Sequence, residues 1–304
     1  MPPLALPGTG RTWERFEALA AMGAADLSVA RILEAHFDAE AILHELHAAD
    51  LAQPGRLWGV WAAQPPTARV EARRGAGESW SLAGTKAWCS GATVCSHALV
   101  TATAADGPRL FAVALADPAV RPGPDEWASA ALAAADTRAV EFRDASARAI
   151  GRAQHYVARP GFWHGAVGVA AVWYGGALGV GRRLLEAGRR GDIGDIGRAH
   201  LGGVGASLAA ARAALRDAAT AIDDDPQDAS GCAAIRARET RAVVEASALE
   251  VIDRVGRALG PGPLASEPEH QQRVADLTLY LRQSHAERDL ADLGERLISS
   301  PLTW

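Results

Sequence analysis

The sequence predicts an α+β fold made of short N-terminal helices, a central antiparallel β-barrel and a C-terminal four-helix bundle. Three observations support this order of elements. Apolar residues recur every three or four positions between residues 11 and 50, short β-rich runs fill residues 57–144, and long helical stretches follow residue 162. With 304 residues the chain is long enough to bury more than one core.

The N-terminal helical segment is expected over residues 1–54, where the apolar spacing fits two or three short helices. Pro54-Gly55 ends that pattern, because these residues punctuate local structure. The β-barrel domain is expected over residues 55–154 and the four-helix bundle over residues 155–304.

The barrel prediction rests on six short runs that are rich in strand-forming residues. They are LWGVWAA, ARVEARR, SWSLAGTKAW, HALVTATA, RLFAVAL and AVEFRD, and Gly, Pro and Asp residues separate them. Runs spaced by roughly 8 to 12 residues are typical of an antiparallel barrel or sandwich.

The bundle prediction rests on four helical stretches joined by short loops. They cover about 162–190, 196–222, 229–258 and 267–296. Several glycines lie inside them, namely Gly175, Gly176, Gly179, Gly181, Gly202, Gly203 and Gly205. Because these glycines follow no strand, they indicate close helix packing and not a dinucleotide-binding loop.

Composition excludes several function classes. A net charge of −5 gives no basic surface for nucleic acid, and no run of about 18 apolar residues could span a membrane. The first residues lack the pattern of a secretory signal, so we expect a cytoplasmic protein. Three cysteines without paired spacing predict reduced thiols, and His44 and His47 miss the H-E-x-x-H spacing, so we expect no metal.

Local sequence words then resemble the acyl-CoA dehydrogenase family. Trp80–Ala92, WSLAGTKAWCSGA, is similar to a strand pair of that family. Ala63-Gln64-Pro65 falls where the family usually has a Thr-Glu-Pro turn, and Gly161-Phe162-Trp163 resembles the entry to its first bundle helix. The chain is identified as a short, divergent member over roughly residues 55–290, with a truncated N-terminal helical domain.

The resemblance implies FAD as cofactor and assigns it three residues in the barrel. Trp88 stands where the family places an aromatic residue beside the flavin, and Ser90 where it places a hydroxyl near the flavin's reactive edge. Gln64 is a candidate for the pyrimidine edge. A flat apolar face and nearby hydrogen-bonding groups are what a protein supplies to orient a flavin.

Four further residues are candidates for binding the pyrophosphate of FAD. Arginine side chains or backbone N–H groups are needed there to balance its negative charge. Arg198 resembles a family arginine that reaches FAD across a subunit interface. Gly260 and Gly262 occupy the position of a family glycine turn, with Arg257 just before it. The alternative interpretation of this turn is a plain connection between two helices.

The catalytic base expected from the family is absent at its usual position. If Arg273 and Asp276 are the counterparts of the family's Arg-Asp pair, the expected glutamate position holds Ser284. Glu287 and His285 are the nearest substitutes, and they lie two residues apart on the fourth helical stretch. Glu245 and Glu250, on another bundle helix, are further candidates.

Three functions follow. The first is an FAD-dependent oxidoreductase that dehydrogenates an acyl thioester at its α,β bond and works as a homo-dimer or homo-tetramer. The second is a flavin-dependent monooxygenase of the same fold. The resemblance implies this alternative because related monooxygenases use a His in this C-terminal region where the dehydrogenases use Glu. The third is a catalytically degenerate subunit or scaffold that pairs with a homologous partner subunit.

Overall fold

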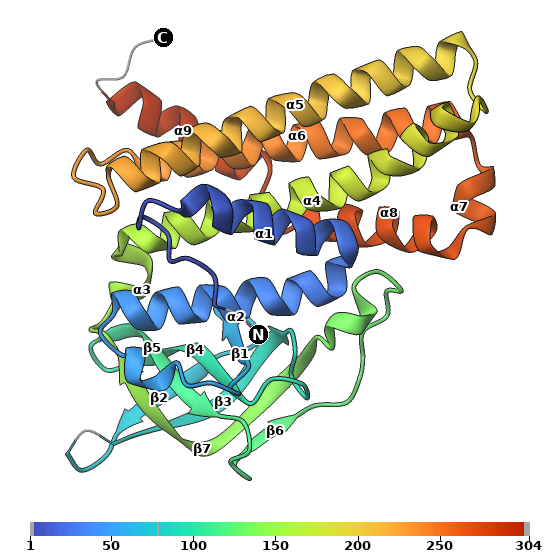
Figure 1. Cartoon of the computed structure of the whole chain (residues 1–304). Helices are drawn as coiled ribbons and strands as arrows, with labels where there is room; N and C mark the ends of the chain where they lie inside the picture. The colour runs from blue at the N-terminus through green and yellow to red at the C-terminus, as the bar shows by residue number, and fades with distance from the viewer. Residues whose placement is uncertain (1–2, 78, 301–304) are drawn as a thin grey trace. The chain divides into compact units, whose positions relative to one another are not determined.

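The secondary structure is described here from a computed structural model, which covers residues 3–77 and 79–300. Contacts between residues divide the chain into two compact units. A helical unit holds residues 1–30, 130–132 and 163–304, and a barrel unit holds residues 31–129 and 133–162. Figure 1 labels the elements of both units along the chain.

The barrel unit contains the strands that the sequence predicted, together with a short one that it missed. The strands are β1 (Trp58–Trp61), β2 (Val70–Arg74), β3 (Trp80–Cys89), β4 (His97–Ala104), β5 (Gly107–Ala114), β6 (Val120–Pro122) and β7 (Arg138–Ile150). They follow the order β1-β4-β2-β3-β7-β5, and an additional β4–β5 pairing closes a small barrel. The missed strand, β6, is only three residues long and pairs with β7.

The barrel is not wholly antiparallel, which corrects the prediction. β4 runs parallel to β1, with Trp58 opposite His97, and parallel to β2 at the single pair Glu71–Thr103. The other pairings are antiparallel. A parallel pair needs a crossover connection, and the β2–β3 hairpin lies within the connection between β1 and β4. Strand patterns in the sequence do not specify such long-range partners.

Alternating side chains fill the barrel interior. Its core includes Trp61, Leu82, Phe111, Val140 and Phe142, all at most 3% exposed. A second apolar cluster joins the outer side of the strands to α2 (Leu27–Glu45). A 3-10 turn (Ala49–Leu51) and a short helix, α3 (His155–Ala158), complete this unit.

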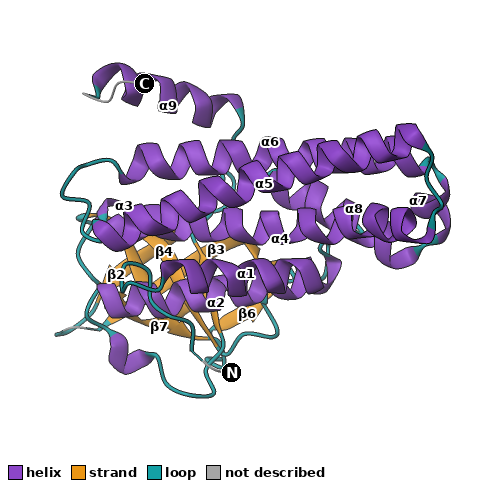
Figure 2. Cartoon of the chain, turned by 45° about the horizontal axis from the view of Figure 1, so that its top comes forward, coloured by secondary structure: helices purple, strands orange, loops and turns teal. Residues whose placement is uncertain are grey.

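The helical unit is built mainly from helices of very different lengths. They are α1 (Thr12–Ala25), α4 (Pro160–Arg190, from Trp163 in this unit), α5 (Asp195–Asp224), α6 (Ala233–Leu259), α7 (Gly262–Ser266), α8 (Pro268–Leu281) and α9 (Glu287–Ser299). α5 packs along α6, and α9 lies against α6 (Figure 2). Over the described ranges, none of the helices is long and apolar enough to cross a membrane.

The fourth predicted helix is interrupted, which corrects the continuous stretch 267–296. α8 ends at Leu281 and α9 begins at Glu287, and Ala286 between them adopts a φ of +47°. From Arg282 to Asp289 the sequence is polar except for one alanine. A helix needs an apolar face to pack, and this segment has none to continue the buried face of α8.

Close packing of α4 explains part of the predicted glycine pattern. A Cβ added at Gly175 would lie 2.0 Å from the carbonyl oxygen of Ala20 in α1, and one at Gly176 would lie 2.9 Å from Leu277 in α8. Gly202 and Gly205 in α5 are different, because an added Cβ there would meet no described atom within 4 Å. The packing interpretation is therefore correct for α4 and wrong for these two glycines.

The N-terminus of α1 is capped by a residue far away in the sequence. Asp223, in the last turn of α5, accepts hydrogen bonds from the backbone N–H groups of Gly10 (2.9 Å) and Thr12 (3.0 Å). It also accepts one from the Thr12 hydroxyl (2.6 Å). A carboxylate satisfies free N–H groups at a helix start and is favoured there by the helix dipole. α1 is thereby fixed to the end of α5.

The two kinds of glycine give a direct test of packing. We expect Gly175→Ala to lower the free energy of unfolding by about 2 kcal/mol or more, because the backbone of α1 blocks the new methyl group. Gly202→Ala should instead raise it by up to about 1 kcal/mol through helix propensity. Urea unfolding followed by circular dichroism measures both, and equal effects would contradict the assignment.

Candidate functional site

A β-bulge places the first candidate residue on the barrel surface. Along β3 the pairing with β7 moves from Lys86–Val140 to Cys89–Arg138, so β3 holds one residue more than β7 there. Within the bulge Trp88 adopts a φ of +57°, a left-handed conformation that glycine usually occupies. The bulge turns the indole outward, and Trp88 is 63% exposed.

Ser90 lies just past the bulge and is held by its neighbours. Its hydroxyl is 3.0 Å from the hydroxyl of Thr137, and its carbonyl oxygen accepts a hydrogen bond from the Trp61 indole N–H (3.0 Å). The next residue, Gly91, donates its N–H to the carbonyl oxygen of Ala135 (2.8 Å). A half-buried hydroxyl and an exposed indole therefore sit two residues apart on a fixed turn.

Gln64 follows β1 and is tied to the barrel interior. Its amide Nε2 donates to the hydroxyl of Thr101 (3.2 Å), and that hydroxyl donates to the carbonyl oxygen of Ala62 (3.3 Å). Lys86 donates to both the carbonyl oxygen and the hydroxyl of Thr101, each at 2.7 Å. The sequence assigned no role to Lys86 or Thr101.

Lys86 is a buried cation with no carboxylate in contact among the described residues. It is 1% exposed, and loss of solvent lowers its pKa to about 8. Burial raises the pKa of the nearby Cys89 thiol, so that group stays neutral. One signal could have marked this residue in the sequence, since Lys86 is the only lysine in a chain that otherwise uses arginine.

The pyrophosphate candidates lie in the helical unit. Arg198, in the first turn of α5, pairs with Asp195 (3.0 Å), and Arg257, in the last turn of α6, pairs with Asp253 (3.4 Å). Gly203 of α5 faces Arg254 of α6, so the two arginines are at the same end of this helix pair.

The backbone conformation explains why a glycine follows α6. Gly260 follows the last residue of α6 with a φ of +67°, and Gly262 begins α7. A Cβ added at either glycine would meet no described atom within 4 Å. Gly260 thus ends a helix in the way glycine commonly does, and nothing approaches the turn closely.

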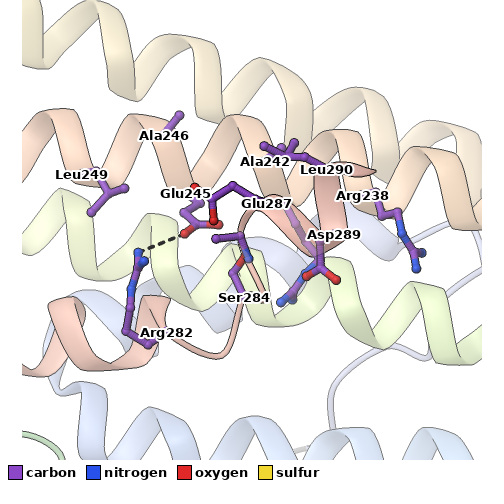
Figure 3. A pocket seen from close by; sticks show the side chains of 12 residues that line it. Arg238, Ala242, Glu245, Ala246, Leu249, Arg282, Ser284, Glu287, Asp289 and Leu290 are labelled. Atoms are coloured by element: carbon purple, nitrogen blue, oxygen red, sulfur yellow. Dashed lines mark hydrogen bonds and ion pairs between the residues drawn. The ribbon is translucent and has the colours of Figure 1, made fainter. Parts of the chain in front are cut away.

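Two of the four base candidates line a cleft of about 230 Å³ in the helical unit (Figure 3). Glu245 of α6, Ser284 of the turn and Glu287 at the start of α9 line it. Apolar atoms of Ala242, Ala246, Leu249 and Leu290 make up part of its wall. The interruption between α8 and α9 is what brings Ser284 and Glu287 to α6.

The carboxylates and His285 differ in their partners. Glu245 pairs with Arg282 (2.9 Å), and Glu250 pairs with Arg254 (2.6 Å). Glu287 has no ion pair within residues 3–77 and 79–300. His285 precedes α9, does not line the cleft and pairs with Asp289 (3.5 Å). Arg238, Arg241 and Arg282 also line the cleft, and Glu287 is the base candidate there that forms no ion pair among the described residues.

Arg273 and Asp276, from which the expected base position was located in the sequence, have separate partners, and Arg273 donates to the carbonyl oxygen of Ala25 (3.4 Å). Asp276 is 5% exposed and accepts hydrogen bonds from the Leu132 N–H (2.6 Å) and the Gln272 amide (2.7 Å). Burial raises the pKa of its carboxyl group. Asp276 therefore anchors residues 130–132 to α8.

No family model matches this chain, and no curated protein matches it. Solved structures do. KijD3 in complex with dTDP is 21% identical, with a TM-score of 0.80 over 95% of this chain and 82% of that chain. TdsC from Paenibacillus sp. A11-2 with FMN and indole is 17% identical, with a TM-score of 0.82 over 94% and 83%. A nitrososynthase from Micromonospora carbonacea var. africana is 20% identical, with a TM-score of 0.80 over 97% and 83%.

These likenesses extend over nearly the whole chain at low identity, and they establish its fold. The chain has the acyl-CoA dehydrogenase-like fold, as the local words at Trp80–Ala92 indicated.

The strain at Trp88 can be measured in the protein without ligand. We expect Trp88→Gly to be more stable than Trp88→Ala by about 1 kcal/mol, because only glycine adopts the left-handed conformation without a steric cost. Urea unfolding of the two variants measures the difference. Equal stability would mean that the bulge is not strained.

The buried lysine makes stability depend on pH in a defined direction. In the unfolded chain Lys86 titrates near pH 10.4, and in the folded chain near 8. Below pH 8 it is charged in both states and the burial cost is fully present. Between the two values the folded protein loses its proton first, so unfolding takes up a proton and stability rises with pH.

We therefore expect the stability of the wild type relative to Lys86→Met to rise by up to about 3 kcal/mol between pH 7 and 11. Urea unfolding across this range checks it. Cys89 also titrates in this range, and burial raises the pKa of its thiol in the folded chain. Repeating both measurements in a Cys89→Ala background removes its contribution. A difference that does not change with pH would contradict the burial of a charged lysine.

Proposed function

We propose that this chain is a flavin-dependent oxidoreductase. One observation carries the proposal: a strained bulge exposes the Trp88 indole two residues before Ser90, on a fold shared with KijD3 and TdsC. Both of those proteins have been solved in complex with FMN. Strain at an exposed aromatic residue is typical of a functional position.

The barrel residues fit what a flavin ring requires. Trp88 offers an apolar face for stacking, Ser90 offers a hydroxyl with spare hydrogen-bonding capacity, and Gln64 offers an amide. A bound flavin would supply the redox chemistry, accepting a hydride or, when reduced, reacting with dioxygen. The chain's own residues would orient the ring and exclude water from one face.

The flavin could be FAD, as the resemblance implies, or FMN, as in the complexes of KijD3 and TdsC. The residues of this chain support binding of the flavin ring more strongly than binding of the FAD pyrophosphate. Arg198 and Arg257 each have an aspartate partner, and Gly260 serves as the end of a helix. FMN is therefore our first choice, with FAD as the alternative.

For the reaction, α,β-dehydrogenation of an acyl thioester gains support from Glu287. This carboxylate lines a partly apolar cleft and has no ion pair among the described residues, as a base that removes an α-proton would require. In this role Arg282 would stay paired with Glu245, and Arg238, which also lines the cleft, would stay paired with Asp292.

A monooxygenase is the second candidate, because TdsC, a dibenzothiophene monooxygenase, shares the fold at a TM-score of 0.80 over 96% of this chain. His285 is exposed, and its sequence neighbours Ser284 and Ala286 line the same cleft. The two reactions differ in their source of electrons. A dehydrogenase takes them from its substrate, whereas a monooxygenase needs an external reductant and dioxygen.

The test begins with titration of purified protein with FMN and with FAD, followed by visible absorbance. We expect one of them to bind with a dissociation constant in the micromolar range or below, and Trp88→Ala to weaken binding about tenfold. If neither flavin binds, the chain is the non-catalytic subunit considered above, and the oxidoreductase proposal fails.

The loaded protein then distinguishes the reactions. Without oxygen, loss of visible absorbance on adding acyl thioesters indicates dehydrogenation, and Glu287→Gln should slow it at least a hundredfold while His285→Gln has little effect. Oxygen-dependent product formation that requires a flavin reductase indicates the monooxygenase instead. Retention of dehydrogenation in Glu287→Gln would remove this residue as the base.

A further inference from the structure

The lone lysine of this chain lies at one end of a hydrogen-bonded series. Lys86 on β3 contacts Thr101 on β4, and Thr101 contacts Gln64 after β1. The series begins at a group that is 1% exposed and ends at an exposed amide. It therefore links the barrel interior to the surface beside β1.

Lys86 and the carbonyl oxygen of Ala62 together set the directions of the hydrogen bonds in this series. An ammonium group can only donate, so the Thr101 hydroxyl must accept from it. The single proton of that hydroxyl points to the carbonyl oxygen of Ala62. Its remaining lone pair can only accept, and it faces Gln64 at 3.2 Å. Gln64 must therefore turn its NH₂ group to Thr101.

We propose that Lys86 and Thr101 are positioning residues that hold Gln64 so that it presents its carbonyl oxygen, Oε1, as an acceptor to a ligand N–H group. The ligand class is a heterocycle with an imide N–H, and the pyrimidine ring of a flavin carries one. The inference rests on the proposed flavin function, and it adds the residues that determine which edge of the ring is recognised.

The arrangement explains why a charge is buried at this place. Without a donor at position 86, the Thr101 hydroxyl would be held by the carbonyl oxygen of Ala62 alone. It could then rotate and donate to Gln64, and the amide could turn over. A side chain that both donates and accepts leaves the orientation of an exposed amide undetermined. A lysine ammonium removes that freedom because it has no lone pair.

Loss of the Lys86 proton would release the constraint. Val140, opposite Lys86 on β7, is apolar, and Thr101 on β4 does not titrate. Cys89 on the same strand is the titratable group that acts on Lys86, and burial keeps its thiol neutral. The orientation of Gln64 should therefore follow the titration of Lys86 itself.

The first experiment uses the protein without flavin. Because the chain has one lysine, labelling with ¹⁵N,¹³C-lysine gives a single side-chain signal to titrate by NMR. The side-chain amide signals of Gln64, assigned by their loss in Gln64→Asn, are followed in ¹⁵N-labelled protein. We expect both to change with the same midpoint. A Gln64 amide that stays constant while Lys86 titrates would overturn the inference.

The second experiment compares FMN with N3-methyl-FMN, which lacks the imide N–H. The wild type should bind FMN about tenfold more tightly than the methylated analogue. Thr101→Val and Lys86→Met should bring this ratio close to one, and Thr101→Ser, which keeps the hydroxyl, should restore it. A purely structural role would weaken both ligands equally and leave the ratio unchanged.

The two experiments distinguish failure of the flavin-binding proposal from failure of the positioning role of Lys86 and Thr101. If the wild type binds no flavin, the proposed function fails, and the NMR titration still decides whether Lys86 orients Gln64. If flavin binds and Thr101→Val keeps the full discrimination, the positioning role is wrong and the flavin proposal survives.

Discussion

The barrel depends on how it accommodates one buried charge. An ammonium group inside an apolar core is costly unless oxygen atoms replace the water it loses. Thr101 supplies two of them, each 2.7 Å from Lys86, and this joins β3 to β4 across the barrel. The inward position of Lys86 and that of Cys89 set the register on either side of the bulge. The residue between them, Trp88, is consequently turned outward.

The helical unit is organised by close contact in one region and by charged groups in another. Around Gly175 the backbones of α1 and α4 approach so closely that no side chain fits between them. α9 has no buried residue and is held to α6 through polar contacts, including the ion pair of Arg238 with Asp292. Such contacts contribute less than apolar burial, so α9 and its cleft are the less firmly held part of the unit.

Two of the candidate residues owe their position to a local break in regular structure. The β3 bulge exposes Trp88 next to Ser90, and the break between α8 and α9 brings Glu287 to a cleft beside α6. Breaks of this kind cost backbone hydrogen bonds or introduce strain, and they are common where the displaced side chain takes part in function. This coincidence links the fold to the proposed activity.

The sequence alone determined the order of the helices and strands, apart from the short β6 and the break between α8 and α9, and the resemblance at Trp80–Ala92, because periodicity and short words are local properties. It could not determine that β4 runs parallel to β1 and β2, since strand partners are separated by long stretches of chain. The position of Glu287 beside α6, without an ion pair among the described residues, also depended on packing. Lys86 was visible as a single lysine, but only the tertiary structure placed Thr101 and Gln64 beside it, because hydrogen bonds across a barrel leave no periodic trace in the sequence.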